Sequence, residues 1–196
     1  MILVYSILLF IVLSLLTGGK PRFFHEHDLR GIFLPVAAFA VEALAPLLNT
    51  LLPVPPEQWH WCSIILQYSL LLLFCCLNRH NKAFLPIFMG TVLNFAVISA
   101  NGFRMPATPI INDIPQLSSY ADRIASGELF EYILTDYSAP LWFLGDTIAI
   151  PFLGMGLASA GDFLLAGGVG LLIFKLMRPP KNKKAEINQP QPQAHL

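Results

Sequence analysis

The chain has 196 residues, of which 55% are hydrophobic and 12% are charged, and its mean hydropathy is +0.62. This composition excludes an ordinary soluble domain, in which about 25% of residues are charged. The formal net charge is zero, so no nucleic acid is expected as a partner. Cys62, Cys75 and Cys76 form neither a disulfide framework nor a zinc pattern, and we expect them to pack as small apolar side chains. No cofactor is predicted.

Residues 2–17 form the first apolar segment, just long enough to cross a bilayer. No basic residue precedes Lys20, so we interpret the segment as a retained helix with its N-terminus outside. A short charged stretch follows, in which His25 and His27 alternate with Glu26 and Asp28. A histidine pair two residues apart suits an extended strand, and no further ligands lie nearby in the sequence, so a solvated loop is a better interpretation than a metal site.

Three further apolar segments follow at residues 31–53, 61–77 and 83–100. Each carries a polar residue in its interior: Glu42, Gln67 and Asn94, respectively. Ionisable and amide side chains are costly inside a bilayer, so these three residues are candidates for a proton relay, a ligand contact or an internal hydrogen bond.

The sizeable loop of the chain covers residues 101–140 and opens with Asn101 and Arg104. Within it, Ser119 and Asp122 have the spacing of a capping box, and helical periodicity continues to Leu134. We predict an amphipathic helix at the membrane surface here. The fifth apolar segment, residues 159–177, precedes a basic and then Pro/Gln-rich tail.

The sequence therefore predicts an all-α membrane protein, a bundle of about five transmembrane helices with one external amphipathic helix. A single domain covers residues 1–178, and residues 179–196 form a disordered cytoplasmic tail. With five crossings, ten Lys and Arg residues fall on one side, and only Arg104 and Arg123 fall on the other. This asymmetry predicts a plasma-membrane protein with its N-terminus outside and its C-terminus in the cytoplasm.

Two acidic residues, Asp146 and Asp162, lie in an otherwise apolar stretch, and each follows a glycine. One interpretation is structural, because Ser159 and Asp162 have the spacing of a capping box at the start of the fifth helix. The other is a catalytic aspartate pair that shares a proton, with one carboxyl acting as base and the other as acid. Pro151, Gly154 and Gly156 would let the chain fold back as a hairpin and bring the two together.

The segments TGGKPRF, ANGFRMP and LGD…P…SAGD resemble a family of bacterial multi-pass membrane proteins with no assigned activity. The stretch SAGDFLLAGGVGLLIF also resembles the last motif of lipoprotein signal peptidases, four-span enzymes with a catalytic aspartate pair near the outer face. That resemblance implies Asp146 and Asp162 as the first and second catalytic aspartates. The sequence departs from that family at Ala96 and Val97, where an Asp-Arg pair is expected, and at Ser159, where Asn is expected.

Three functions stay open at this point. The first is a membrane-embedded aspartyl hydrolase that acts on a lipidated peptide or protein, with Asn94, Asn101, Arg104 and Ser159 as positioning groups. The second is a non-catalytic protein that binds membrane lipids or a partner transmembrane helix through the glycines of the fifth helix. The third is a small proton-coupled transporter that uses Glu42, Gln67 and Asn94.

Overall fold

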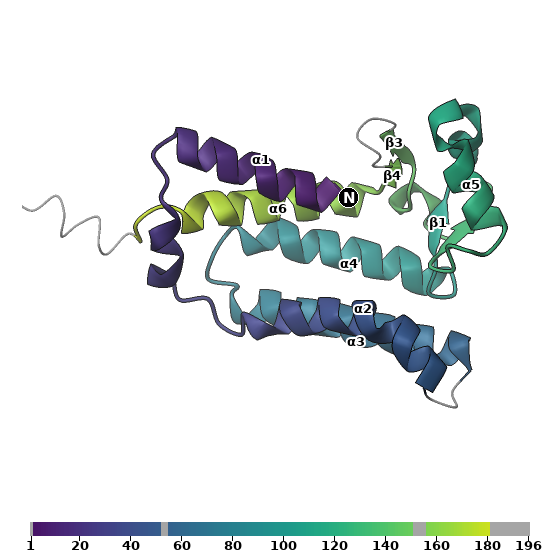
Figure 1. Cartoon of the computed structure of the whole chain (residues 1–196), viewed down its shortest axis with the longest axis horizontal. Coiled ribbons are helices and arrows are strands. Elements are labelled where there is room, and N and C mark those ends of the chain that lie inside the picture. Colours follow the sequence, from purple (N-terminus) through teal and green to yellow (C-terminus); the bar gives the residue numbers. More distant parts are fainter. Residues whose placement is uncertain (1, 52–54, 151–155, 181–196) are drawn as a thin grey trace, which may run out of the picture.

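The computed structural model describes residues 2–51, 55–150 and 156–180, and the protein is mostly helical (Figure 1). Five long helices lie roughly side by side along the long axis of the molecule. They are α1 (Ile2–Leu16), α2 (Phe33–Leu51), α3 (Pro56–Leu77), α4 (Phe84–Ala100) and α6 (Ala160–Leu176). Their positions follow the five apolar segments of the sequence, because long apolar runs without proline at the centre favour helix.

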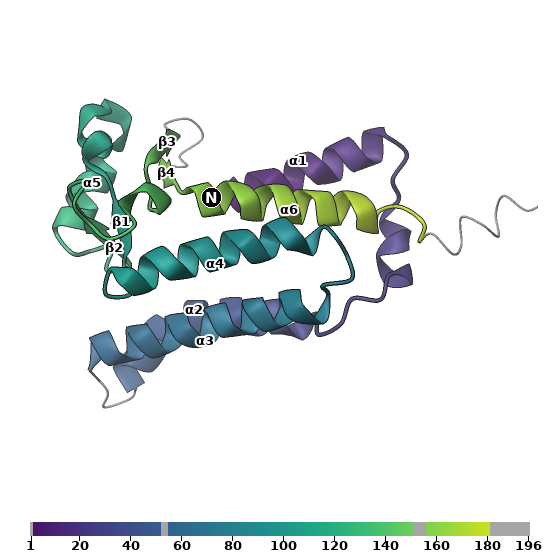
Figure 2. The same cartoon turned by 180° about the vertical axis from the view of Figure 1, so that it is seen from behind.

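Helix α6, the last in the chain, packs between α1 and α4, and α3 packs between α4 and α2. Figures 1 and 2 show α1, α6 and α4 on one side and the α2–α3 pair on the other. The first and last helices run in the same direction, so the N-terminus of α1 lies beside the start of α6. The 3-10 helix η1 (Pro21–Glu26) lies at the opposite end of the bundle.

Glycines let α6 approach its two neighbours closely. A Cβ on Gly168 would lie 2.6 Å from a side-chain carbon of Ile87 in α4, and one on Gly170 would overlap the ring of Phe10 in α1. The glycine face that the sequence suggested for a partner helix is therefore filled from within the chain. Gly167 is different, because a Cβ there would meet nothing within 4 Å.

A cap of short elements covers the bundle end at which α4 finishes and α6 begins (Figure 1). It comprises α5 (Ser118–Ala125), β1 (Met105–Ala107), β2 (Tyr132–Leu134), β3 (Ile148–Ile150), β4 (Gly156–Ala158) and three 3-10 turns, η2 (Pro109–Asp113), η3 (Pro115–Leu117) and η4 (Trp142–Leu144). β1 pairs with β2 in parallel, and β3 pairs with β4 antiparallel. The cap has its own buried core, formed by Ala107, Ile111, Leu117, Ala121, Ile124 and Leu157.

The cap corrects two predictions. The chain is not purely α-helical, since β1 and β2 lie in its predicted loop and β3 and β4 lie between that loop and the fifth helix. The external helix is also shorter than predicted and is N-capped by Leu117 without a side-chain hydrogen bond, so the Ser119/Asp122 capping box is absent. The helix gives way to a turn at Gly127, whose φ of +77° favours glycine, and the chain then enters β2.

The expected hairpin before the fifth helix is present. Ile148 pairs with Ala158 and Ile150 with Gly156, which brings the chain back toward the start of α6. Pro151 and Gly154 lie outside the described residues.

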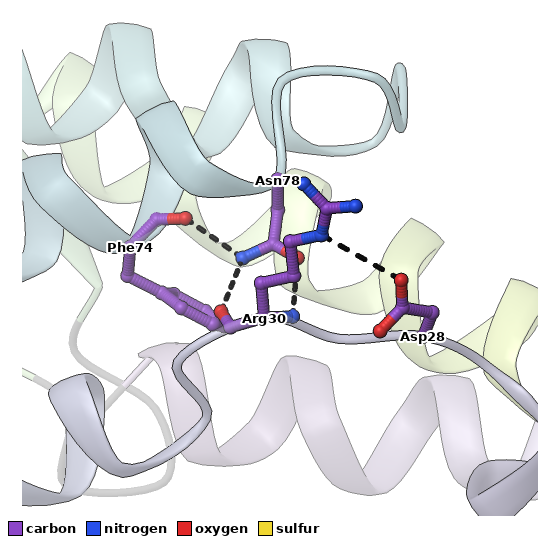
Figure 3. A network of polar contacts seen from close by, with 4 residues as sticks. All are labelled: Asp28, Arg30, Phe74 and Asn78. Atoms are coloured by element: carbon purple, nitrogen blue, oxygen red, sulfur yellow. Dashed lines mark hydrogen bonds and ion pairs between the residues drawn. The ribbon is translucent and has the colours of Figure 1, made fainter.

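The opposite end of the bundle is held by Asn78, whose side chain is fully buried at the end of α3 (Figure 3). Its Oδ1 accepts a hydrogen bond from the backbone N–H of Arg30, while its Nδ2 donates to the carbonyls of Arg30 and Phe74. The Arg30 side chain points away and lies 3.6 Å from the carboxylate of Asp28. Asn78 thus fixes the segment that leads into α2 through its backbone alone.

The long helices carry many large apolar side chains on their outer surfaces. Leu16, Phe33, Val36, Leu51 and Leu85 are each more than 60% exposed. Among the described residues, one helical stretch, Glu57–Leu77, is both long enough and apolar enough to cross a bilayer. Ile2–Leu16 and Phe84–Ala100 are apolar but shorter.

Candidate functional site

Asp162 begins the last helix as part of a capping box. Ser159 is the N-cap residue, and its Oγ accepts a hydrogen bond of 3.0 Å from the backbone N–H of Asp162. In return, Asp162 Oδ2 accepts a hydrogen bond of 3.0 Å from the backbone N–H of Ser159. A carboxylate at this position also benefits from the positive end of the helix dipole. The structural interpretation of Asp162 is confirmed.

Asn94 joins this capping box to helix α4. Its Nδ2 donates to Asp162 Oδ1 at 2.8 Å, and its Oδ1 accepts from Ser159 Oγ at 2.9 Å. Asn94 and Ser159 are both buried. The amide therefore provides a donor for Asp162 Oδ1 and an acceptor for the Ser159 hydroxyl. Both hydrogen bonds stabilise the contact, because an unmet hydrogen bond at a buried site costs free energy.

The glycine before Asp162 permits this arrangement. A Cβ on Gly161 would overlap Asn94 Oδ1 and lie 2.9 Å from the carbonyl oxygen of Gly90. A Cβ on Gly90 would in turn lie 2.5 Å from the carbonyl oxygen of Gly161. The two helices thus touch backbone to backbone at the level of the Asn94 side chain.

The backbone of Asp146 pairs with strand β1. Its backbone N–H donates to the carbonyl of Pro106 at 2.9 Å, and its carbonyl accepts from the N–H of Thr108 at 3.3 Å. The pairing with Ala107 is parallel. The preceding Gly145 is needed for close approach, because a Cβ there would lie 2.5 Å from the carbonyl oxygen of Pro106.

The carboxyl group of Asp146 is buried and incompletely hydrogen-bonded. The residue is 4% exposed, and its Oδ1 has no hydrogen-bond partner in the described part of the chain. Burial, together with a smaller effect of the negative charge of Asp162, raises the pKa of this carboxyl to about 8. Asp146 is therefore mostly protonated at pH 7.

Two tyrosines lie within the electrostatic reach of Asp146. Tyr120 in α5 and Tyr132 in β2 meet edge to face, with ring centroids 5.7 Å apart. Burial raises the pKa of both phenols, and the charge of Asp146 adds to the increase in each. Tyr120 also lies against Gly156, whose Cβ would be 3.9 Å from the ring. These tyrosines could not be identified as neighbours from the sequence, because two tyrosines twelve residues apart match no recognisable motif.

The two aspartates thus influence each other without touching. Asp162 contributes to the raised pKa of Asp146, so their charges interact. No hydrogen bond joins the two carboxyl groups among the residues described, and Asp162 uses both oxygens in contacts with Asn94 and Ser159. The two carboxyl groups lie in different environments. The carboxylate of Asp162 accepts hydrogen bonds from two N–H donors, whereas the carboxyl of Asp146 is buried away from water.

The remaining predicted site residues are dispersed. Asn101 Nδ2 donates to the carbonyls of Val97 and Pro140, which ties the cap to the end of α4. The Arg104 guanidinium lies over the ring of Phe130, with its central carbon 3.9 Å from the ring centroid. Gln67 lies in the middle of α3, and the side chain of Glu42 lies outside the described residues. The described residues contain no group of three or more metal-ligating side chains.

Comparison with known proteins places the chain among proteins without an assigned role. Residues 26–174, from the end of η1 almost to the end of α6, match the family of unknown function DUF5317. The chain is also similar to an uncharacterised protein of Thermotoga maritima, with 27% identity over 173 residues that cover 88% of this chain and 89% of the relative. No solved structure matches the chain. Because the match includes α2 to α6, the whole cap and both aspartates, the chain belongs to the DUF5317 family.

Proposed function

We propose that the chain is an integral membrane protein whose five long helices cross the plasma membrane. The support is the apolar outer surface of these helices, since water-exposed patches of this extent are rare on soluble proteins. Large side chains at least 45% exposed occur on every long helix: Val4, Leu8, Leu9, Val12, Leu15, Leu16, Phe33, Val36, Phe39, Leu44, Leu47, Leu51, Leu66, Leu73, Leu85, Phe163 and Leu171. Three of the five helices, α1, α4 and α6, are short for a bilayer and would need local thinning of the membrane.

The cap and the N-terminus would lie outside the cell. Seven basic residues cluster at the ends of the helices far from the cap, namely Lys20, Arg22, Arg30, Arg79, Lys82, Lys175 and Arg178. The cap end has Arg104 and Arg123. Basic residues favour the cytoplasmic side.

The orientation is testable by cysteine labelling. In a variant without the three native cysteines, Ser126→Cys in the cap and Arg79→Cys at the opposite end each supply a single thiol. In intact cells a membrane-impermeant maleimide should label the first and spare the second. Labelling of Arg79→Cys with protection of Ser126→Cys would reverse the orientation.

At the outer face we propose a hydrolase site in which Asp146 acts as the general acid and Asp162 as the general base. The observation that carries this proposal is the buried Asp146 carboxyl, which holds a proton near neutral pH and leaves Oδ1 without a partner. Pairs of carboxyls whose environments drive their protonation apart are typical of such catalysis. The proposed substrate is an ester or amide of a lipidated peptide or a lipid at the outer leaflet.

In this scheme Asp162 is the base. It takes a proton from water as the water oxygen bonds to the carbonyl carbon, and Asp146 gives its proton to the leaving group as the ester or amide bond breaks. The Asp162 carboxylate accepts one hydrogen bond from the side chain of Asn94 and one from the backbone N–H of Ser159, and the Ser159 hydroxyl donates to Asn94, so Asn94 and Ser159 are positioning residues. The charge of Asp146 reaches the tyrosine pair Tyr120 and Tyr132, in both of which it raises the pKa of the phenol.

The experiment is complementation of a deletion strain by single-carboxyl variants. Asp146→Asn and Asp162→Asn should each abolish rescue, since loss of a general acid or base lowers a rate about 10²- to 10⁴-fold. Asp122→Asn, which removes an exposed acid of the same cap, is the matched control and should rescue fully. Full rescue by both Asn variants, produced at wild-type levels, would contradict the hydrolase.

A second candidate function is lipid binding without catalysis. It is favoured by the capping box and the Asn94 contact, which give both carboxylate oxygens of Asp162 a structural hydrogen bond without any catalytic role. Asp162→Glu separates the two candidates, because glutamate at this position keeps the capping box but moves the carboxylate by one methylene. The binding function predicts that Asp162→Glu rescues, whereas the hydrolase predicts that it does not.

A further inference from the structure

Arg104 occupies an unusual setting at the end of the bundle that carries the cap. The central carbon of its guanidinium lies over the ring of Phe130, 3.9 Å from the centroid, and His60 packs against the same ring in a T-shaped contact, with centroids 5.0 Å apart. His60 comes from the first turns of α3, Arg104 directly precedes β1, and Phe130 directly precedes Glu131 and β2. Three separate segments of the chain therefore converge on one aromatic ring.

The backbone is strained where it delivers Arg104 to this ring. Phe103 has a φ of +61°, a conformation that bulky residues rarely adopt and that is energetically unfavourable for them. Two neighbours in α3 hold it there. His60 Nε2 lies 2.7 Å from the carbonyl oxygen of Phe103, and the ring of Trp61 stacks at a tilt against the ring of Phe103, with centroids 5.8 Å apart.

The guanidinium so positioned has no acidic partner. In the part of the chain that the structure describes, Arg30 and Arg123 pair with carboxylates, whereas Arg104 forms no ion pair and its side chain donates no hydrogen bond. The contact with the Phe130 ring takes up none of the guanidinium N–H donors in a conventional hydrogen bond, so these donors stay available for a ligand. A planar fork of donors suits an oxyanion with two oxygens.

We propose that Arg104, held on Phe130 and supported by His60, binds a single phosphate group. The site lies where α3 begins and α4 has ended, which is the level of the outer lipid headgroups if the helices cross the membrane as proposed above. The phosphate of a membrane lipid and free inorganic phosphate share the chemistry that this site recognises. Binding itself requires neither Asp146 nor Asp162, so its test is independent of the hydrolase.

The test uses the full chain, purified in detergent and freed of lipid. Apparent Kd values come from the rise in Tm with added ligand. The ligands are dioctanoyl phosphatidylglycerol, dioctanoylglycerol (which lacks the phosphate) and inorganic phosphate. We expect phosphatidylglycerol to bind wild type, dioctanoylglycerol to bind at least about tenfold more weakly, and Arg104→Gln to weaken phosphatidylglycerol binding about tenfold, as for a lost charged hydrogen bond.

Two further variants keep the test decisive. Arg123→Gln removes a cap arginine that is already paired with Glu128 and should leave binding unchanged. Phe130→Leu retains every charge and should still weaken binding, because the guanidinium loses its platform. Tight binding of phosphate alone would make the free ion the ligand. Equal binding by Arg104→Gln and wild type, or equal losses in Arg104→Gln and Arg123→Gln, would overturn the site.

Failure of this test would leave the hydrolase proposal intact. Asp146→Asn should bind phosphatidylglycerol as wild type does, even where it fails to rescue the deletion strain. Conversely, rescue by Asp146→Asn together with normal binding would remove the hydrolase and retain the phosphate site.

Discussion

The side chain of Asn94 donates a hydrogen bond of 2.8 Å to the carboxylate of Asp162, across 68 residues of sequence. The same amide accepts from Ser159, so one residue in the middle of the chain completes the start of the last helix. A capping box is usually a local device between residues three apart. Here it is extended into a tertiary contact, which couples the start of α6 to the packing of α4.

Replacing Asn94 should therefore destabilise the protein strongly. Asn94→Leu removes the acceptor of the Ser159 hydroxyl proton and the donor to Asp162 Oδ1 at a largely buried site, at an expected cost of about 2 to 4 kcal/mol. Thermal unfolding in detergent measures the effect. Thr91→Val is the matched control on the same helix, because the Thr91 hydroxyl bonds only the carbonyl of Ile87 one turn earlier. Equal Tm values for the two variants would show that the amide bridge contributes little.

A comparison of two glycines in α6 tests the close contact between helices. Gly161→Ala should cost about 1 to 3 kcal/mol or more, because the added methyl overlaps Asn94 and the backbone of Gly90. Gly167→Ala should be neutral or stabilise by about 0.5 to 1 kcal/mol, since the methyl enters open space and alanine favours helix. The two Tm values should move in opposite directions, and a loss at position 167 as large as that at 161 would contradict the packing.

The stability of the protein should fall as pH rises through neutrality, because of Asp146. Its pKa is about 8 when folded and near 3.9 when unfolded, so between these values the unfolded chain has lost a proton that the folded chain keeps. The contribution is full below about pH 4 and is lost as pH rises toward 8. At 1.36 kcal/mol per pH unit, Tm should fall by about 5 to 10 °C between pH 6 and pH 8.

Asp146→Asn should remove most of this dependence, because an amide does not titrate in this range. The variant should lose markedly less Tm between pH 6 and pH 8 than wild type does. Asp136 is an exposed carboxyl of the same cap whose pKa is lowered by hydrogen bonds from Ser138, so Asp136→Asn should leave the pH dependence above 6 unchanged. A wild-type slope that persists in Asp146→Asn would assign the titration to another group.

At the other end of the bundle, the structure predicts that the side chain of Asn78 contributes more to stability than the side chain of Arg30. Asn78→Ala removes three hydrogen bonds from a fully buried site and should lower the free energy of unfolding by about 2 to 4 kcal/mol. Arg30→Ala should cost less than about 1 kcal/mol, because Asn78 binds the backbone of Arg30 and the Arg30 side chain makes only an exposed ion pair with Asp28. Tm measurements would contradict this assignment if Arg30→Ala were the more harmful change.

The five long helices could be predicted because apolar runs of fifteen or more residues carry a strong signal. The cap could not, because strands of three residues are too short to establish an alternating pattern. The excess length of the predicted external helix could have been avoided, since Ser126 and Gly127 already mark a helix end in the sequence. The capping box of Ser159 and Asp162 could also be predicted, because its two residues lie only three positions apart in the sequence.

The long-range contacts within the site could not be predicted from the sequence. Asn94 was identified as an interior polar residue, but its partners lie 65 and 68 residues away, at Ser159 and Asp162. Arg104 was expected beside the aspartates and instead stacks on Phe130, which had no distinguishing pattern. Long-range pairings of this kind depend on the packing of whole elements, and spacing in one sequence does not report them.

The parallel pairing of Asp146 with β1 makes the cap mechanically continuous with the bundle. β1 begins five residues after the end of α4, and α4 is fixed to α6 by the backbone contact at Gly90 and Gly161. These elements must therefore shift together. The α2–α3 hairpin contacts the rest of the bundle mainly through the smaller interface between α3 and α4. His60 and Trp61 of α3 also contact Phe103 and Phe130 at the cap end, so α3 is coupled to the cap as well.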